Sequence, residues 1–153
     1  MTEDGHQVAH LSAALEGADR DSTIDRFRSG AAKVLITTNV LARGIDVSSV
    51  TMVVNYDIPE ARNGAADPET YLHRIGRTGR FGKVGVAVSF ISNRKGWEQL
   101  NEISRHFGCA IDPLPTDNWE EVEERVKKVI KSARAGKSTQ EMQGDAMVDG
   151  AAE

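Results

Sequence analysis

The sequence predicts an α/β fold built on a parallel β-sheet, and three observations lead to that prediction. Three short runs rich in Val and Ile are nearly continuous in apolar residues, which is typical of strands covered on both faces. Segments with helical periodicity lie between and after these runs. Strands and helices therefore alternate along the chain, as parallel strands joined by crossover helices require. The runs are KVLIT (33–37), TMVVNYD (51–57) and VGVAVSFIS (84–92).

The chain begins with one possible strand and one helix before the first clear strand. The stretch HQVAHLS (6–12) is compatible with a short strand, but no strand and helix precede it. We therefore expect the sheet to lack its first strand. In the helix predicted over 19–30, Ile24 and Phe27 share one face, and Gly30 is a good C-terminal cap.

Three further helices are predicted after the second strand. The stretch DPETYLHRIG begins with Asp67 as N-cap and Pro68 at the first helical position. A second helix covers 94–108 and ends at a glycine, and a third covers 116–136. We expect both to bury an apolar face, including both tryptophans: Trp97, Leu100, Ser104 and Phe107 on one, and Trp119, Val122, Val126, Val129 and Ala133 on the other.

Length and composition suggest one folded domain, residues 1–135, followed by a disordered acidic tail, residues 136–153. Cys109 is the only cysteine, so no internal disulfide can form, which favours a reducing compartment such as the cytosol or nucleus. No apolar run is long enough to span a membrane. The formal net charge of −4 argues against coating nucleic acid by bulk charge, but it leaves room for a local basic cleft.

The stretch LITTNVLARGID (35–46) has the composition of a phosphate-binding strand end. A buried strand leads into threonines, whose hydroxyls suit phosphate oxygens at the carboxyl end of a parallel strand. Gly44 permits close backbone approach to a ligand, and Asp46 could accept hydrogen bonds from ribose hydroxyls. The alternative is a surface turn in which Arg43 pairs with Asp46. These residues alone do not decide between the two.

The stretch YLHRIGRTGRFG (71–82) concentrates positive charge among glycines. Arg77 lies one helical turn after His73, and Arg80 follows beyond Gly79, so the two guanidiniums can converge on one anion. Planar guanidiniums are well suited to phosphate oxygens, and arginine fingers contribute about 10³–10⁵ in rate. The alternative is a solvated basic turn whose arginines pair with carboxylates. The composition of the stretch, three arginines among three glycines, disfavours this alternative.

Both stretches resemble motifs of a known family, the DEAD-box RNA helicases. LITTNVLARGID is similar to motif V, YLHRIGRTGRFG to motif VI, and RDSTIDRFRSG (20–30) to the motif before them. The resemblance extends from about Gly5 to Arg134 and implies the second of two RecA-like domains. In this family ATP lies between the two domains, and single-stranded RNA crosses both. The phosphate-binding loop and the Asp-Glu-Ala-Asp acids belong to the first domain, which this sequence lacks.

The resemblance also implies a role for individual residues. Arg77 and Arg80 would be catalytic arginine fingers at the ATP γ-phosphate, and Gly44 and Asp46 would complete the ATP site, with Asp46 at the ribose. Mg²⁺ would accompany ATP and be held by the missing first domain, so no metal ligands are expected here. RNA phosphates would be bound by Arg20, Thr38, Arg43 and Gly44, and His73 and Arg74 would couple the two domains.

Two features resemble the messenger-RNA export branch of the family. They are the long segment between Pro59 and Tyr71 and the ending PTDNWEEVEERVKKVIK. The implied location is the cytoplasm and nucleus, at the nuclear pore complex of the nuclear envelope. The implied partners are single-stranded RNA in messenger ribonucleoprotein, the first RecA-like domain, a nucleoporin, and the export factor Gle1 acting with inositol hexakisphosphate.

Lys127 and Lys131 allow two interpretations, which remain equally favoured. Cations close a helix that acidic residues open, which suits the helix dipole, and Glu123 and Lys127 form a favourable pair. The export-branch resemblance instead implies that both lysines contribute to an inositol hexakisphosphate site.

The predicted function is therefore the C-terminal half of an RNA-dependent ATPase, inactive without the first domain. The alternatives are a non-catalytic module that binds a partner, or a DEAD-box helicase of another RNA pathway. A DNA-directed helicase of the same superfamily agrees poorly with HRIGRTGR.

Overall fold

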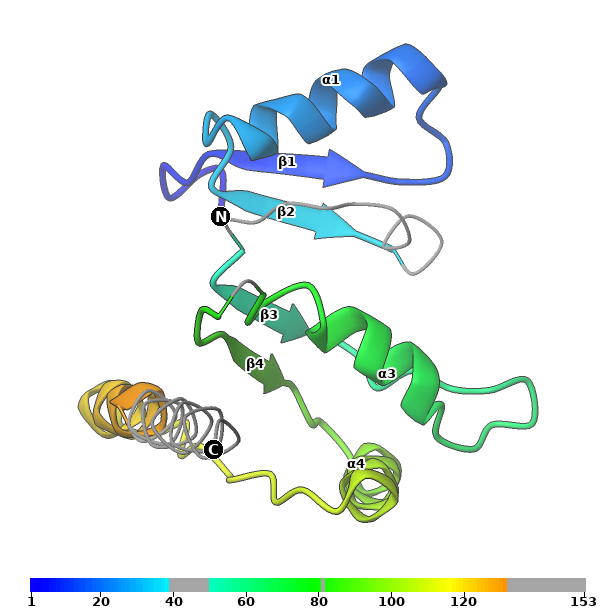
Figure 1. Ribbon diagram of the computed structural model, residues 1–153, viewed down its shortest axis with the longest axis vertical. Coiled ribbons are helices and arrows are strands. Elements are labelled where there is room, and N and C mark those ends of the chain that lie inside the picture. Colours follow the sequence, from blue (N-terminus) through cyan, green and yellow to red (C-terminus); the bar gives the residue numbers. More distant parts are fainter. Residues whose placement is uncertain (39–49, 81, 132–153) are drawn as a thin grey trace, which may run out of the picture.

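The structure is a computed structural model that describes residues 1–38, 50–80 and 82–131 of the chain (Figure 1). The described strands are all parallel, and they form two two-stranded sheets rather than one continuous sheet. The predicted α/β class is confirmed, including the short strand near the start of the chain. The first sheet pairs β1 (Val8–Leu11) with β2 (Val34–Thr37), and the second pairs β3 (Met52–Asn55) with β4 (Val86–Ser89).

The first unit of the fold is a strand–helix–strand crossover. Helix α1 (Gly17–Arg28) connects β1 to β2, starting two residues earlier than the sequence predicted. Its apolar residues Ile24 and Phe27 pack against Leu11, which is completely buried. Val50, which lies between the two sheets in sequence, packs against the same cluster. The face predicted for this helix is therefore the one that the structure buries.

The second unit repeats this arrangement and adds one more helix. Helix α3 (Pro68–Ile75) connects β3 to β4, and α4 (Arg94–Phe107) follows β4. The helix α4 ends at Gly108, whose φ of 62° lies in the left-handed region that glycine adopts readily. Together these elements bury the larger of the two hydrophobic clusters, formed by Ile58, Ala66, Tyr71, Leu100 and Ile103.

Burial on the last two helices differs from the prediction. On α4 the buried residues include Leu100 and Ile103, whereas Trp97 is 49% exposed. A helix also occupies residues 119–131, and there Trp119 is 80% exposed. The expectation that both tryptophans lie in the core is therefore wrong. Periodicity shows which side chains share a face, but burial also requires a surface that packs against that face.

One face of the β3–β4 sheet is apolar and exposed. Met52, Val54 and Tyr56 alternate along β3 and its extension, so they share a face, and they are 49%, 50% and 84% exposed. The ring of Tyr56 meets that of Phe90 edge-on, with 6.1 Å between centroids. The opposite face is polar where it meets α3, because buried Asn55 donates to the Ser89 hydroxyl at 3.2 Å.

The long segment before α3 folds back on itself and is fixed to α4. Glu60 forms an antiparallel bridge with Ala66, and its carboxylate lies 2.7 Å from the Lys95 ammonium. Hydrogen bonds from Lys95 and then Gln99 hold the pKa of Glu60 below its ordinary value. Gln99 also donates to the carbonyl of Gly64 at 3.2 Å. The segment between Pro59 and Tyr71 is thus attached to the body of the domain.

Two further expectations concern the ends of the chain and the membrane. The predicted disordered tail and the last part of the helix predicted over 116–136 lie outside the described residues. Within the described ranges, no helix is both long and apolar enough to cross a membrane.

Candidate functional site

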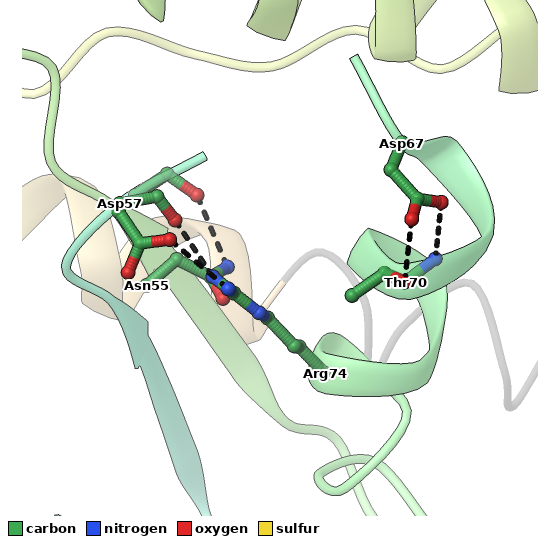
Figure 2. A network of polar contacts seen from close by, with 6 residues as sticks. Asn55, Asp57, Asp67, Thr70 and Arg74 are labelled. Atoms are coloured by element: carbon green, nitrogen blue, oxygen red, sulfur yellow. Dashed lines mark hydrogen bonds and ion pairs between the residues drawn. The ribbon is translucent and has the colours of Figure 1, made fainter. Parts of the chain in front are cut away.

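The helix α3 carries the candidate site, and local sequence fixes where it begins. The Asp67 carboxylate accepts hydrogen bonds from the Thr70 backbone N–H at 2.9 Å and the Thr70 hydroxyl at 2.7 Å (Figure 2). Pro68 follows at the first helical position, as predicted. The backbone N–H bond, followed by the hydroxyl bond, holds the pKa of Asp67 below its ordinary range. The cap satisfies a backbone donor that would otherwise be unpaired.

Arg77 and Arg80 lie in the turn that directly follows α3. The helix is capped at Gly76, and Gly79 has a φ of 73°, which reverses the chain between the two arginines. Arg77 Nε donates to the His73 carbonyl at 3.2 Å, and Arg80 Nε donates to the Gly76 carbonyl at 2.8 Å. Each guanidinium is therefore held against the carbonyl four residues earlier, within one short turn. Their convergence on one anion stays a prediction.

Arg74 is bound to Asp57 within the domain. Its side chain is 13% exposed and donates to Asp57 twice, from Nη1 to the carbonyl at 2.7 Å and from Nη2 to the carboxylate at 3.0 Å. Figure 2 shows Arg74 reaching from α3 to Asp57, which follows β3. The neighbouring His73 is exposed. The coupling role for His73 and Arg74 stays a prediction.

The residues proposed for RNA are only partly described by the structure. Arg20 lies on α1 and is half-buried, and Thr38 is exposed directly after β2. The other candidates in this stretch, Arg43, Gly44 and Asp46, lie outside the described residues. The structure therefore shows where the predicted site begins but not its loop.

Thr38 and the arginine turn lie at opposite ends of the parallel strands. The four arrows in Figure 1 point the same way, and Thr38 follows the carboxyl end of β2. The arginine turn instead touches the amino end of β3, where the Thr78 hydroxyl donates to the Val50 carbonyl at 2.9 Å. Thr38 and the hydrogen bond between Thr78 and Val50 thus lie at opposite ends of the described strands.

The two lysines predicted for a polyphosphate lie on the helix at 119–131, and the predicted ion pair is present. Lys127 Nζ is 2.6 Å from the carboxylate of Glu123, and this hydrogen bond lowers the Glu123 pKa. Both side chains are exposed, and such solvent-screened pairs contribute little to stability. A densely charged ligand could replace so weak a partner, so the pair does not decide between the two interpretations. Lys131 is also exposed.

No cluster of three or more His, Cys, Asp or Glu side chains suitable for a metal ion occurs in the part of the chain that the structure describes. The candidate site is cationic because it carries Arg77 and Arg80, and guanidinium groups are suited to binding phosphate oxygens.

Three residues that support the arginine turn were missed in the sequence: Asp57, Thr78 and Gly85. A Cβ added to Gly85 would lie 2.4 Å from the Gly79 nitrogen and 2.1 Å from the Thr78 hydroxyl oxygen, so only glycine fits there. Asp57 and Gly85 flank strands that were recognised, and Thr78 separates the two arginines. A position next to a strand end could have pointed to a residue that holds the turn in place. The spacing in the sequence does not show which residue it would contact.

Comparison with known proteins extends these observations. The family described as Helicase conserved C-terminal domain matches residues 1–82. The chain is similar to "ATP-dependent RNA helicase DBP5" of Phaeosphaeria nodorum, with 64% identity over 143 residues. That match covers 93% of this chain but only 30% of the relative, so the chain spans about a third of its length.

Solved structures show the same similarity. S. cerevisiae Dbp5 bound to RNA and ADP BeF3 is 55% identical, with a TM-score of 0.77 over 84% of this chain and 33% of that one. A variant of S. cerevisiae Dbp5 bound to Nup159, a variant of Gle1, inositol hexakisphosphate and ADP is 50% identical, with a TM-score of 0.77. That match covers 85% of this chain and 33% of that one.

Proposed function

Because the chain belongs to the helicase conserved C-terminal domain family, we propose that it is the C-terminal RecA-like part of an ATP-dependent DEAD-box RNA helicase in messenger-RNA export. The observation that carries this proposal is the arginine turn, in which Arg77 and Arg80 are both anchored through Nε. The similarity to Dbp5 over 93% of the chain favours the export branch over other RNA pathways.

ATP is the substrate in this proposal, and its γ-phosphoryl group is transferred to water. Arg77 and Arg80 bind the phosphate oxygens and stabilise the charge that develops on them, which is the role of arginine fingers. Because their Nε atoms are bonded to the chain, the planes of the guanidiniums are oriented before substrate arrives. Gly44 and Asp46 complete the ATP site in this proposal, and the first domain holds Mg²⁺.

The RNA backbone is assigned in this proposal to the region beyond the carboxyl end of β2. Thr38 offers an exposed hydroxyl beyond the end of β2, and Arg20 adds a cation from α1. With Arg43 and Gly44 they bind the RNA backbone rather than its bases, which gives affinity without sequence specificity. Gly44 is assigned to both ATP and RNA in this proposal, and His73 and Arg74 are assigned to coupling with the first domain.

The proposed partners are Gle1 and a nucleoporin, at the nuclear pore complex, because Gle1 and Nup159 accompany the similar Dbp5. Lys127 and Lys131 are assigned to an inositol hexakisphosphate site that is shared with Gle1. They lie one turn apart on one helix, so both ammonium groups can reach one densely charged ligand.

The test uses an exchange helicase, which is the P. nodorum DBP5 relative with this chain in place of the segment it matches. We expect RNA-stimulated ATP hydrolysis by the exchange helicase and none by the chain alone. Replacing Arg77 or Arg80 with Lys should lower kcat by about 10²-fold or more with little change in ATP affinity, because Lys keeps the charge but loses the planar fork. Wild-type kcat in both variants would contradict the arginine-finger assignment.

The second candidate function is a non-catalytic module that binds a partner. It predicts an exchange helicase without RNA-stimulated hydrolysis that still retains Gle1 in a pull-down. Hydrolysis in the exchange helicase would exclude it.

A further inference from the structure

The turn between Arg77 and Arg80 is attached to the body of the domain by Thr78. The Thr78 hydroxyl is part-buried and donates to the Val50 carbonyl at 2.9 Å. Within the turn, the backbone N–H of Thr78 bonds to the Ile75 carbonyl at 3.1 Å. Thr78 therefore joins the end of α3 to the chain that leads into β3, across 28 residues of sequence.

Val50 makes this attachment more than a local one. Its side chain packs against the hydrophobic cluster around Leu11 in the first unit of the fold. The Val50 carbonyl accepts the hydrogen bond from the Thr78 hydroxyl. The position of Val50 is fixed in turn by packing against residues of α1 and the first sheet. The arginine turn belongs to the second unit but is positioned against the first.

The other side of Thr78 is closed by Gly85, just before β4. A Cβ built on Gly85 would approach Thr78 Oγ1 to 2.1 Å, Thr78 Cγ2 to 2.7 Å and the Gly79 nitrogen to 2.4 Å. All three are shorter than a real Cβ contact, so the Thr78 side chain fills the space that the glycine leaves. The turn is held on one side by a hydrogen bond and on the other by close packing.

The last turn of the same helix is attached to the other end of β3. Arg74 reaches Asp57 after β3, whereas Thr78 reaches Val50 before it. The last turn of α3 therefore has two anchors along one strand, and rotation of the helix about either anchor would break the other. Arg77 lies between these anchors in sequence and Arg80 lies two residues beyond, so their positions depend on both.

We propose that Thr78 is a positioning residue for the ATPase reaction, which sets where Arg77 and Arg80 meet the γ-phosphoryl group. It does not contact the substrate but acts through the arginines. The inference rests on the proposed function. Because arginine-finger stabilisation depends on geometry, and a displacement of about 1 Å can cost about 10²-fold in rate, a loosened turn should lower kcat.

The test compares substitutions in the exchange helicase. Thr78→Val keeps the shape of the side chain but removes the donor, and Thr78→Ser keeps the donor. The matched control is Thr70→Val, which loses a hydroxyl bond on the same helix but at its start, where Thr70 Oγ1 donates to Asp67. Should Thr78→Val fail to fold, Thr78→Ala removes the hydroxyl without the added methyl and takes its place.

We expect Thr78→Val to lower kcat at least about tenfold with the KM for ATP and RNA affinity within about twofold, while Thr78→Ser and Thr70→Val stay near wild type. Thr78→Val should also weaken binding of ADP with beryllium fluoride, which mimics the γ-phosphate, and leave ADP binding unchanged. Wild-type kcat in Thr78→Val, an equal loss in Thr70→Val, or no rescue by Thr78→Ser would overturn the proposal. An inactive wild-type exchange helicase would instead contradict the proposed function, and the nucleotide-binding comparison would still test Thr78.

Discussion

Replacing Asp67 tests whether the N-cap holds α3, and with it the site, in place. Asp67→Ala removes the acceptor of two hydrogen bonds from Thr70, at 2.9 and 2.7 Å. Loss of an N-cap costs about 0.5–2 kcal/mol, and we take about 1 kcal/mol because Asp67 is only partly buried and its charge is screened by water. That corresponds to about a fivefold loss of protection at the start of α3.

The assay is amide hydrogen exchange followed by mass spectrometry, with peptides that cover residues 67–75. Protection there reports local opening of the helix and does not require the whole chain to unfold as one unit. Corrected for intrinsic exchange rates, Asp67→Ala should lose protection in these peptides and nowhere in α4. Equal protection in wild type and Asp67→Ala would refute the assignment of this cap.

The lowered pKa of Asp67 also predicts how the protection of the α3 amides against exchange depends on pH. The folded-state pKa of Asp67 is lowered, so the stabilisation by its ionised carboxylate is fully present above the ordinary Asp pKa of about 4. It is lost as pH falls from there through the lower, folded pKa. Asp67→Asn, which still accepts a hydrogen bond but carries no charge, should keep most of the protection and lose this acid-side decline. A decline that persists in Asp67→Asn would assign it to another group.

The remaining predictions concern the core and the C-terminal helix. Ile103→Ala should destabilise the second unit by about 2–5 kcal/mol, because Ile103 is 1% exposed, whereas Trp119→Ala, at an 80% exposed position, should change thermal stability little. Comparable losses in the two variants would contradict the observed burial. Lys127→Glu combined with Lys131→Glu should abolish the enhancement of Gle1 binding by inositol hexakisphosphate in a pull-down, while RNA-stimulated ATPase activity survives. Equal enhancement in wild type and the double variant would favour the helix-dipole interpretation.

The elements predicted best from the sequence are those that local chemistry determines. Asp67 and Gly108 cap their helices as expected, because capping depends on residues within one turn of the helix end. That Arg77 and Arg80 lie in one short turn was also predictable, since glycines at 76 and 79 end the helix there. Motif spacing was sufficient wherever the relevant partners are close in sequence.

Contacts between distant segments were not predictable. Trp97 and Trp119 each lie on a helix face with apolar residues. Their burial would also require another element to pack against that face, and both are exposed. The link from Thr78 to Val50 spans 28 residues and ends on a backbone carbonyl, which has no sequence signature. The division into two sheets depends likewise on which strand edges meet in space.

The division of the strands into two pairs has a consequence for cooperativity. Each pair of strands is joined by its own crossover helix and lies beside its own hydrophobic cluster. In the part of the chain that the structure describes, the two pairs share no ladder of backbone hydrogen bonds. Such units can open as separate foldons, each with its own free energy. A ligand that binds only the unit of β1 and β2 stabilises that unit against unfolding by mass action. The unit of β3 and β4 is stabilised by the same ligand only through contacts that join the two units. The bond between Thr78 and Val50 is one such contact, so its removal should separate the two unfolding transitions further.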